Sequence, residues 1–179
     1  MSRASGSPAS PSSSSRGAAF LDALLSRPSF DKQALEGVAD VAFPAPGRCT
    51  CRFPVRAEAR NRYGTLHGGC VATLVDVIST AALVTVSDSP GVSADLSVSY
   101  LRPGPGGEDV DVDARVLKVG RALAFMEVTI SDARGRVVAK GSHTKFLPPR
   151  QAAEGESAGD EGPAGERSGA SEGARRARL

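Results

Sequence analysis

The sequence predicts an α+β domain in which an antiparallel sheet wraps around one long central helix. After Gly69, about 18 residues carry one charge, Asp76, and apolar or small residues occupy every side, as in a helix buried nearly all round. A predicted hairpin precedes this stretch, and four predicted strands follow it. A single curled sheet would supply the apolar surroundings that such a helix needs.

By composition the chain divides into a folded middle and two polar ends. All aromatic residues lie between Phe20 and Phe146, residues 1–16 are half Ser, and the C-terminal end is rich in Gly, Ala, Glu and Arg. Neither end can bury enough apolar surface to offset its ordering entropy. We therefore predict a disordered Ser-rich leader over 1–16, a folded domain over 17–148 and a disordered tail over 149–179.

The composition also excludes several classes of protein. A net charge of +2 and few aromatic residues argue against a dedicated nucleic-acid-binding protein. No apolar run approaches the roughly 20 residues of a membrane span. The three cysteines cannot form a closed disulfide framework, and Cys49 and Cys51 lack a second ligand pair for zinc. We expect reduced thiols, with Cys70 as a small buried filler, and neither a metal nor a cofactor.

The segments before the central helix predict two short helices and a hairpin. Residues 18–26 have helical spacing of apolar side chains, and Ser29 can cap a second short helix. Two β-like runs follow, over 38–43 and 48–55, and a Pro/Gly turn over 44–47 separates them.

After the central helix the pattern predicts four strands, over 92–101, 109–119, 122–131 and 136–147. The turns between the later strands are short, which predicts antiparallel neighbours. We therefore expect a four-stranded meander after the helix.

The start of the central helix contains His67-Gly68-Gly69. Paired glycines let another group approach the backbone, and a helix start presents unpaired N–H groups at the positive end of the helix dipole. Such a site can hold an oxyanion or polarise a carbonyl group. The alternative is a plain helix entry with small residues chosen for packing.

Asp76 lies alone in the apolar helix, where an unpaired carboxylate is costly. A functional role explains it, and pairing with an arginine or capping of a nearby segment is the structural alternative. Gly68 and Asp76 lie about 12 Å apart along a helix axis. They therefore cannot act on one carbonyl group within one subunit. If both are catalytic, antiparallel helices of a two-fold dimer would form two composite sites.

Several separated blocks of the sequence match one protein family in order. They are Asn61–Leu83, Pro90–Tyr100, Gly107–Asp109, Val116–Phe125 and Gly141–Lys145. Over about residues 20–147 the chain resembles the hotdog-fold acyl-CoA thioesterases. The resemblance implies a hotdog fold, in which a sheet wraps a central helix, and homodimers that pair again into homotetramers.

The resemblance also implies roles for five residues. Asp76 would act as general base or orient the attacking water, and Ser93 of the same subunit would help to hold that water. Asn61 and the Gly68 amide of the partner subunit would polarise the thioester carbonyl, and His67 would support the loop. Structural alternatives exist for three of these residues: Asn61 as a turn former, Ser93 as an ordinary strand hydroxyl and His67 as a helix cap.

Coenzyme A carries three phosphate groups, so cationic side chains are expected beside its site. By resemblance, the expected substrate-binding residues are Tyr100, Arg102, Lys118, Gly120 and Arg121. Two features depart from the family pattern: Phe146 stands where a polar residue is expected, and the turn over 102–107 is one residue longer. His143, in a predicted strand, is expected to be structural.

The resemblance implies hydrolysis of fatty acyl-CoA to free fatty acid and coenzyme A, with no cofactor. One alternative is a non-catalytic acyl-CoA-binding or interaction module on the same fold. The other is a hotdog dehydratase.

The two ends of the chain leave the cellular compartment of the protein open. Arg3, Arg16 and many serines without an acid give the leader a mild transit-peptide character. The final Ala177-Arg178-Leu179 is similar to a peroxisomal signal of the Ser-Lys-Leu kind. The family resemblance implies cytosol or mitochondria.

Overall fold

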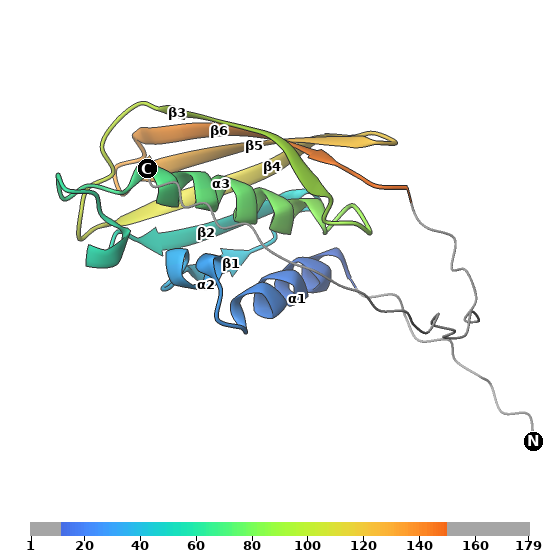
Figure 1. The fold of residues 1–179 in the computed structure, drawn as a ribbon, viewed down its shortest axis with the longest axis horizontal. Coiled ribbons are helices and arrows are strands. Elements are labelled where there is room, and N and C mark those ends of the chain that lie inside the picture. Colours follow the sequence, from blue (N-terminus) through green and yellow to red (C-terminus); the bar gives the residue numbers. More distant parts are fainter. Residues whose placement is uncertain (1–11, 150–179) are drawn as a thin grey trace, which may run out of the picture. The chain divides into compact units, whose positions relative to one another are not determined.

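The computed structural model describes residues 12–149, which contain three α-helices, a short 3₁₀ helix and one six-stranded antiparallel sheet (Figure 1). The helices are α1 (Ser13–Leu25), α2 (Phe30–Ala34), the 3₁₀ helix (Ala57–Ala59) and α3 (Gly68–Leu83). The strands are β1 (Ala39–Ala42), β2 (Arg48–Pro54), β3 (Val92–Tyr100), β4 (Asp109–Val119), β5 (Leu123–Asp132) and β6 (Val137–Phe146). The predicted α+β class is confirmed. Most of the predicted leader and tail, including the terminal Ala177-Arg178-Leu179, lies outside the described residues.

Helix α3 runs along one face of the sheet and contacts every strand from β2 to β6, as well as α1 and α2 (Figure 1). From Cys70 to Leu83 its residues are buried, apart from Ala72 and Asp76, which are half-buried. Together with half-buried Gly68, these two residues recur at every fourth position and therefore share one side of the helix. We call Gly68, Ala72 and Asp76 the open stripe. The predicted all-round burial is confirmed except along it.

The predicted four-stranded meander is wrong for its first strand. The sheet order is β1-β2-β4-β5-β6-β3, so only β4, β5 and β6 are sequential neighbours, and β3 pairs with β6. Short turns keep β4, β5 and β6 adjacent, whereas the longer connection over 101–108 carries the chain from β3 at the sheet edge to β4, which pairs with β2. This connection passes the start of α3, where the Leu66 N–H donates to the Gly104 carbonyl. One side of β3 is left as a sheet edge.

Helix α1 begins earlier than the sequence pattern predicts. Its cap is Ser12, and its first residue is Ser13, so residues 13–16 are helical and not part of a disordered leader. The guanidinium of Arg16 explains the difference, because it donates to the Thr85 carbonyl at 2.7 Å and anchors the first turn to the end of α3.

Among residues 12–149, no helix combines the length and the apolarity that crossing a membrane requires.

Gly141 in β6 sets how closely α3 approaches the sheet. A Cβ atom at this position would lie 2.6 Å from the side chain of fully buried Val75. We predict that Gly141→Ala lowers the free energy of unfolding by about 1–3 kcal/mol, because the helix must move away. Urea denaturation measures this. Ser142→Ala, on the exposed face of the same strand, is the control and should stay within about 0.5 kcal/mol of the wild type. Equal losses in the two variants would contradict the close approach.

Candidate active site

The start of α3 presents a free backbone donor. The imidazole Nδ1 of His67 accepts the Gly69 N–H at 2.9 Å, so His67 caps the helix. The Tyr100 hydroxyl donates to the Gly68 carbonyl at 3.0 Å. Within residues 12–149 no hydrogen bond engages the Gly68 N–H. Because the helix dipole is positive here, this N–H is suited to bind a carbonyl oxygen or an oxyanion.

Asn61 forms the turn that leads into α3. Its Oδ1 accepts the N–H groups of Tyr63 and Thr65 at 2.9 and 3.2 Å, and its Nδ2 donates to the Thr65 hydroxyl at 2.9 Å. The turn-forming alternative is therefore present, although Nδ2 carries a second hydrogen. The residue also lines a cavity of about 370 Å³ beside the helix start. Other lining residues are Gly68, Val71, Tyr100, Arg102 and Gly104.

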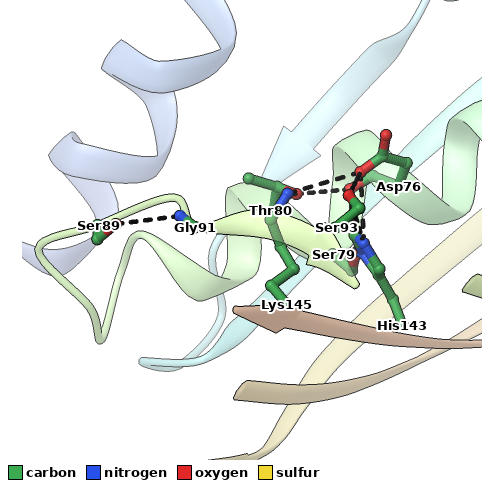
Figure 2. Close-up of polar contacts among 8 residues, drawn as sticks. All are labelled: Asp76, Ser79, Thr80, Ser89, Gly91, Ser93, His143 and Lys145. Carbon is green, nitrogen blue, oxygen red and sulfur yellow. Dashed lines mark hydrogen bonds and ion pairs between the residues drawn. The ribbon is translucent and has the colours of Figure 1, made fainter. Parts of the chain in front are cut away.

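Asp76 lies at the centre of a polar cluster that joins α3, β3 and β6 (Figure 2). Its side chain is 44% exposed, and Oδ1 lies 3.4 Å from the Ser93 hydroxyl, 3.6 Å from Nε2 of His143 and 3.7 Å from Nζ of Lys145. The structure thus brings together Asp76 and Ser93, the pair named from the resemblance. All three contacts go to the same carboxylate oxygen.

His143 connects two serines within this cluster (Figure 2). Its Nδ1 lies 2.8 Å from the Ser79 hydroxyl, and its Nε2 lies 2.9 Å from the Ser93 hydroxyl. Burial and the nearby ammonium of Lys145 lower the pKa of His143 to about 4. The imidazole is therefore neutral at pH 7, with one ring nitrogen donating and the other accepting, so it orients the Ser93 hydroxyl.

Lys145 is buried next to the same carboxylate. Only 6% of the residue is exposed, and Nζ donates to the Thr80 hydroxyl at 2.9 Å. Burial lowers the pKa of Lys145, and the neighbouring Asp76 partly opposes this shift. Sequence reasoning missed this lysine. The alternation of the β6 strand could have found it, because alternate residues of a strand share a face and His143 and Lys145 therefore point the same way as buried Gly141.

The predicted site residues fall into two groups at different places in one subunit. Gly68 at the helix start lies about 12 Å along α3 from Asp76. The substrate-binding candidates are divided similarly. Tyr100 is the last residue of β3. Arg102 lies just after that strand and donates to the Val137 carbonyl at the start of β6. Lys118 lies near the end of β4, and Gly120 and Arg121 lie in the β4–β5 turn, beside the opposite end of β6.

The three cysteines take no part in either group. All are buried and free, and burial raises the pKa of Cys49 and Cys51 to about 12 and that of Cys70 to about 11. Protonated, buried thiols are poor nucleophiles, in agreement with the expected filler role of Cys70. Among residues 12–149 no three His, Cys, Asp or Glu side chains are grouped as metal ligands would be.

Comparisons with known proteins identify the family to which the chain is similar. Residues 63–139 match the family model described as "Thioesterase superfamily". Acyl-coenzyme A thioesterase 13 of Homo sapiens is 49% identical over 105 residues, which cover 58% of this chain and 75% of that protein. The crystal structure of zebrafish thioesterase superfamily member 2 has a TM-score of 0.68 at 42% identity, with 73% of this chain and 94% of that chain covered. A hypothetical thioesterase from Streptococcus pneumoniae, solved with coenzyme A, has a TM-score of 0.62 at 28% identity, with 66% of this chain and 92% of that chain covered.

The depressed pKa of His143 predicts a pH-dependent stability. The unfolded chain, with a His pKa of about 6.5, binds the proton more tightly than the folded protein does. The free energy of unfolding should therefore fall as the pH drops from about 6.5 to about 4. Urea denaturation across this range measures the slope, and His143→Gln should make it shallower. His67→Gln, at the other histidine, is the control, and an unchanged slope in His143→Gln would contradict the assignment.

Proposed function

Since the chain belongs to the thioesterase superfamily, we propose that it hydrolyses fatty acyl-CoA thioesters to free fatty acid and coenzyme A. The observation that carries this proposal is that the free Gly68 N–H and the Asp76 carboxylate lie on the same open stripe of α3. The first can polarise a carbonyl group and the second can activate water. The relatives named acyl-coenzyme A thioesterase 13, and the solved thioesterase that contains coenzyme A, support this substrate class.

The proposed reaction uses water as its only co-reactant. Asp76 removes a proton from a water molecule that Ser93 helps to hold, and the water oxygen bonds to the thioester carbonyl carbon. The electrons of the C=O bond move to the oxygen, which the Gly68 N–H and the second Nδ2 hydrogen of Asn61 stabilise. Collapse of this intermediate breaks the C–S bond. The coenzyme A thiolate leaves and takes up the proton held by Asp76.

We propose that each site is shared by two subunits of a homodimer. The open stripe is centred on Ala72, with Gly68 four residues before it and Asp76 four residues after it. A two-fold axis near Ala72 would place two such helices antiparallel, with Gly68 of one subunit opposite Asp76 of the other. The small side chain of Ala72 allows the two helices to approach closely.

The free edge of β3 supports the same two-fold axis. This strand presents unpaired backbone groups at the edge of the sheet, which are suited to pairing with a second copy. Antiparallel pairing would bring the Tyr100 end of one strand to the Val92 end of the other. Val92 lies opposite Phe146, which in turn lies opposite Leu123 near the β4–β5 turn. The divided substrate-binding candidates would thus meet around one coenzyme A.

We further propose that dimers pair into tetramers. Exposed apolar side chains at one end of the sheet support a second contact surface, because water contact with such a patch is unfavourable. They are Val92, Leu117, Val119, Leu123, Phe125 and Phe146.

Asp76→Asn tests the proposed base. The amide keeps the size of the side chain but cannot accept the proton of water. We expect kcat for release of thiol from a fatty acyl-CoA to fall by about 10²–10⁴-fold, with the fold retained. Turnover near that of the wild type would contradict the mechanism. Binding of acyl-CoA by the wild type without any thiol release would indicate a binding module and overturn the proposed function.

Mixing two inactive variants tests the shared site. Asn61→Asp keeps the Oδ1 contacts of the turn but loses the Nδ2 donor, and Asp76→Asn loses the base. After joint unfolding and refolding, half of the dimers contain one of each variant, and one of their two sites is intact. About a quarter of wild-type turnover should therefore return. A mixture no more active than the average of its two components would place the whole site within one subunit.

A further inference from the structure

The carboxylate of Asp76 is held from one side only. Ser93, His143 and Lys145 all contact Oδ1 (Figure 2), and within residues 12–149 no side chain bonds to Oδ2. Ser93 and His143 are neutral, because the hydroxyl does not ionise at this pH and the imidazole is unprotonated. The ammonium of Lys145 is therefore the one positive charge in the cluster.

A second connection joins the same lysine to the backbone of Asp76. The Thr80 hydroxyl donates its only hydrogen to the Asp76 carbonyl at 2.7 Å. It can therefore only accept from Nζ of Lys145, which donates to it at 2.9 Å. Thr80 lies one helical turn after Asp76, so the helix itself sets the distance between the ammonium and the carboxylate.

Burying an ammonium ion in this position is expensive for the fold. A well-packed apolar side chain of the same size would serve stability as well or better. Neither Ser93, opposite Lys145 on β3, nor Ala124, opposite it on β5, supplies a compensating charge. The carboxylate of Asp76 does, and it is the residue to which we assign proton removal.

We propose that Lys145 is a positioning residue for Asp76: its ammonium, anchored by Thr80, draws Oδ1 inward and turns Oδ2 toward the attacking water. This inference rests on the role proposed for Asp76 above. Without the ammonium, Oδ1 keeps only neutral partners, and the carboxylate can rotate away from the water. Lys145 itself touches neither the substrate nor the water.

The proposal makes a prediction about pH that a purely structural lysine would not. Asp76 on α3 acts electrostatically on both Lys145 and His143. Lys145 itself and Asp95 on β3 also act on His143. Burial lowers the pKa of Lys145 below its ordinary value of about 10.5. As the pH rises through that lowered pKa the ammonium is lost, so wild-type kcat should fall on the alkaline side.

Lys145→Met, which preserves length and removes the charge, is the main test. We expect kcat to fall about 10- to 100-fold with KM changed less than about twofold, because the base is misplaced while substrate binding is intact. The alkaline decline of kcat should disappear. Lys140→Met, at an exposed position on the same strand, should behave like the wild type. A Lys145→Met protein with wild-type kcat, or with the alkaline decline retained, would overturn the proposal.

Thr80→Val provides an independent test, which decides the question if Lys145→Met does not fold. It removes the acceptor for Nζ while keeping the shape of the side chain. We expect a smaller fall in kcat, and no further fall when Thr80→Val is added to Lys145→Met, because both changes act through the same ammonium. An unchanged kcat in folded Thr80→Val would overturn the anchoring.

The two proposals fail in different ways. If Asp76→Asn keeps wild-type turnover, the proposed base is wrong, whatever Lys145 does. If Asp76→Asn is inactive while Lys145→Met keeps full turnover, only the positioning role is wrong. In a background of Asp76→Asn, Lys145→Met should leave the residual rate unchanged, because the lysine acts through the carboxylate.

Discussion

The burial of α3 against one face of a single sheet is the constraint on which the rest of this structure depends. A helix that contacts strands β2 to β6 must be apolar or small on almost every side. After the exposed Gly69 in its first turn, Ala72 and Asp76 of the open stripe are the only residues of α3 that are not buried. Polar chemistry on this helix is therefore limited to one line of residues, and both groups that can act on a thioester lie there.

The same burial governs the electrostatics of the site. His143 and Lys145 point inward from β6 because alternate residues of a strand share a face, and that face is covered by α3. Taking them from water lowers the pKa of each. A neutral imidazole and a buried ammonium thus converge on one oxygen of Asp76, whereas the other oxygen stays open. The difference between the two oxygens of Asp76 therefore arises from the packing of α3 against the sheet.

The separation of the two reactive groups has a simple origin in helix geometry. A rise of about 1.5 Å per residue places Gly68 and Asp76 beyond reach of one carbonyl group, however the side chains rotate. The stripe's symmetry about Ala72 and the free edge of β3 both favour a two-fold partner. The proposed dimer is thus a consequence of where a single helix can expose functional groups.

Sequence pattern alone determined the buried helix, its capped start, most strand boundaries and the lone carboxylate, because local periodicity and turn chemistry control them. The roles of Ser93 and Asn61 came only from family resemblance. Tertiary structure decided that β3 pairs with β6 and that α1 begins at Ser13, since both depend on contacts between distant segments. It also decided that Lys145 meets Asp76. Which inward-facing residue meets which helix position depends on strand order and on the depth at which the helix packs, and neither is encoded locally.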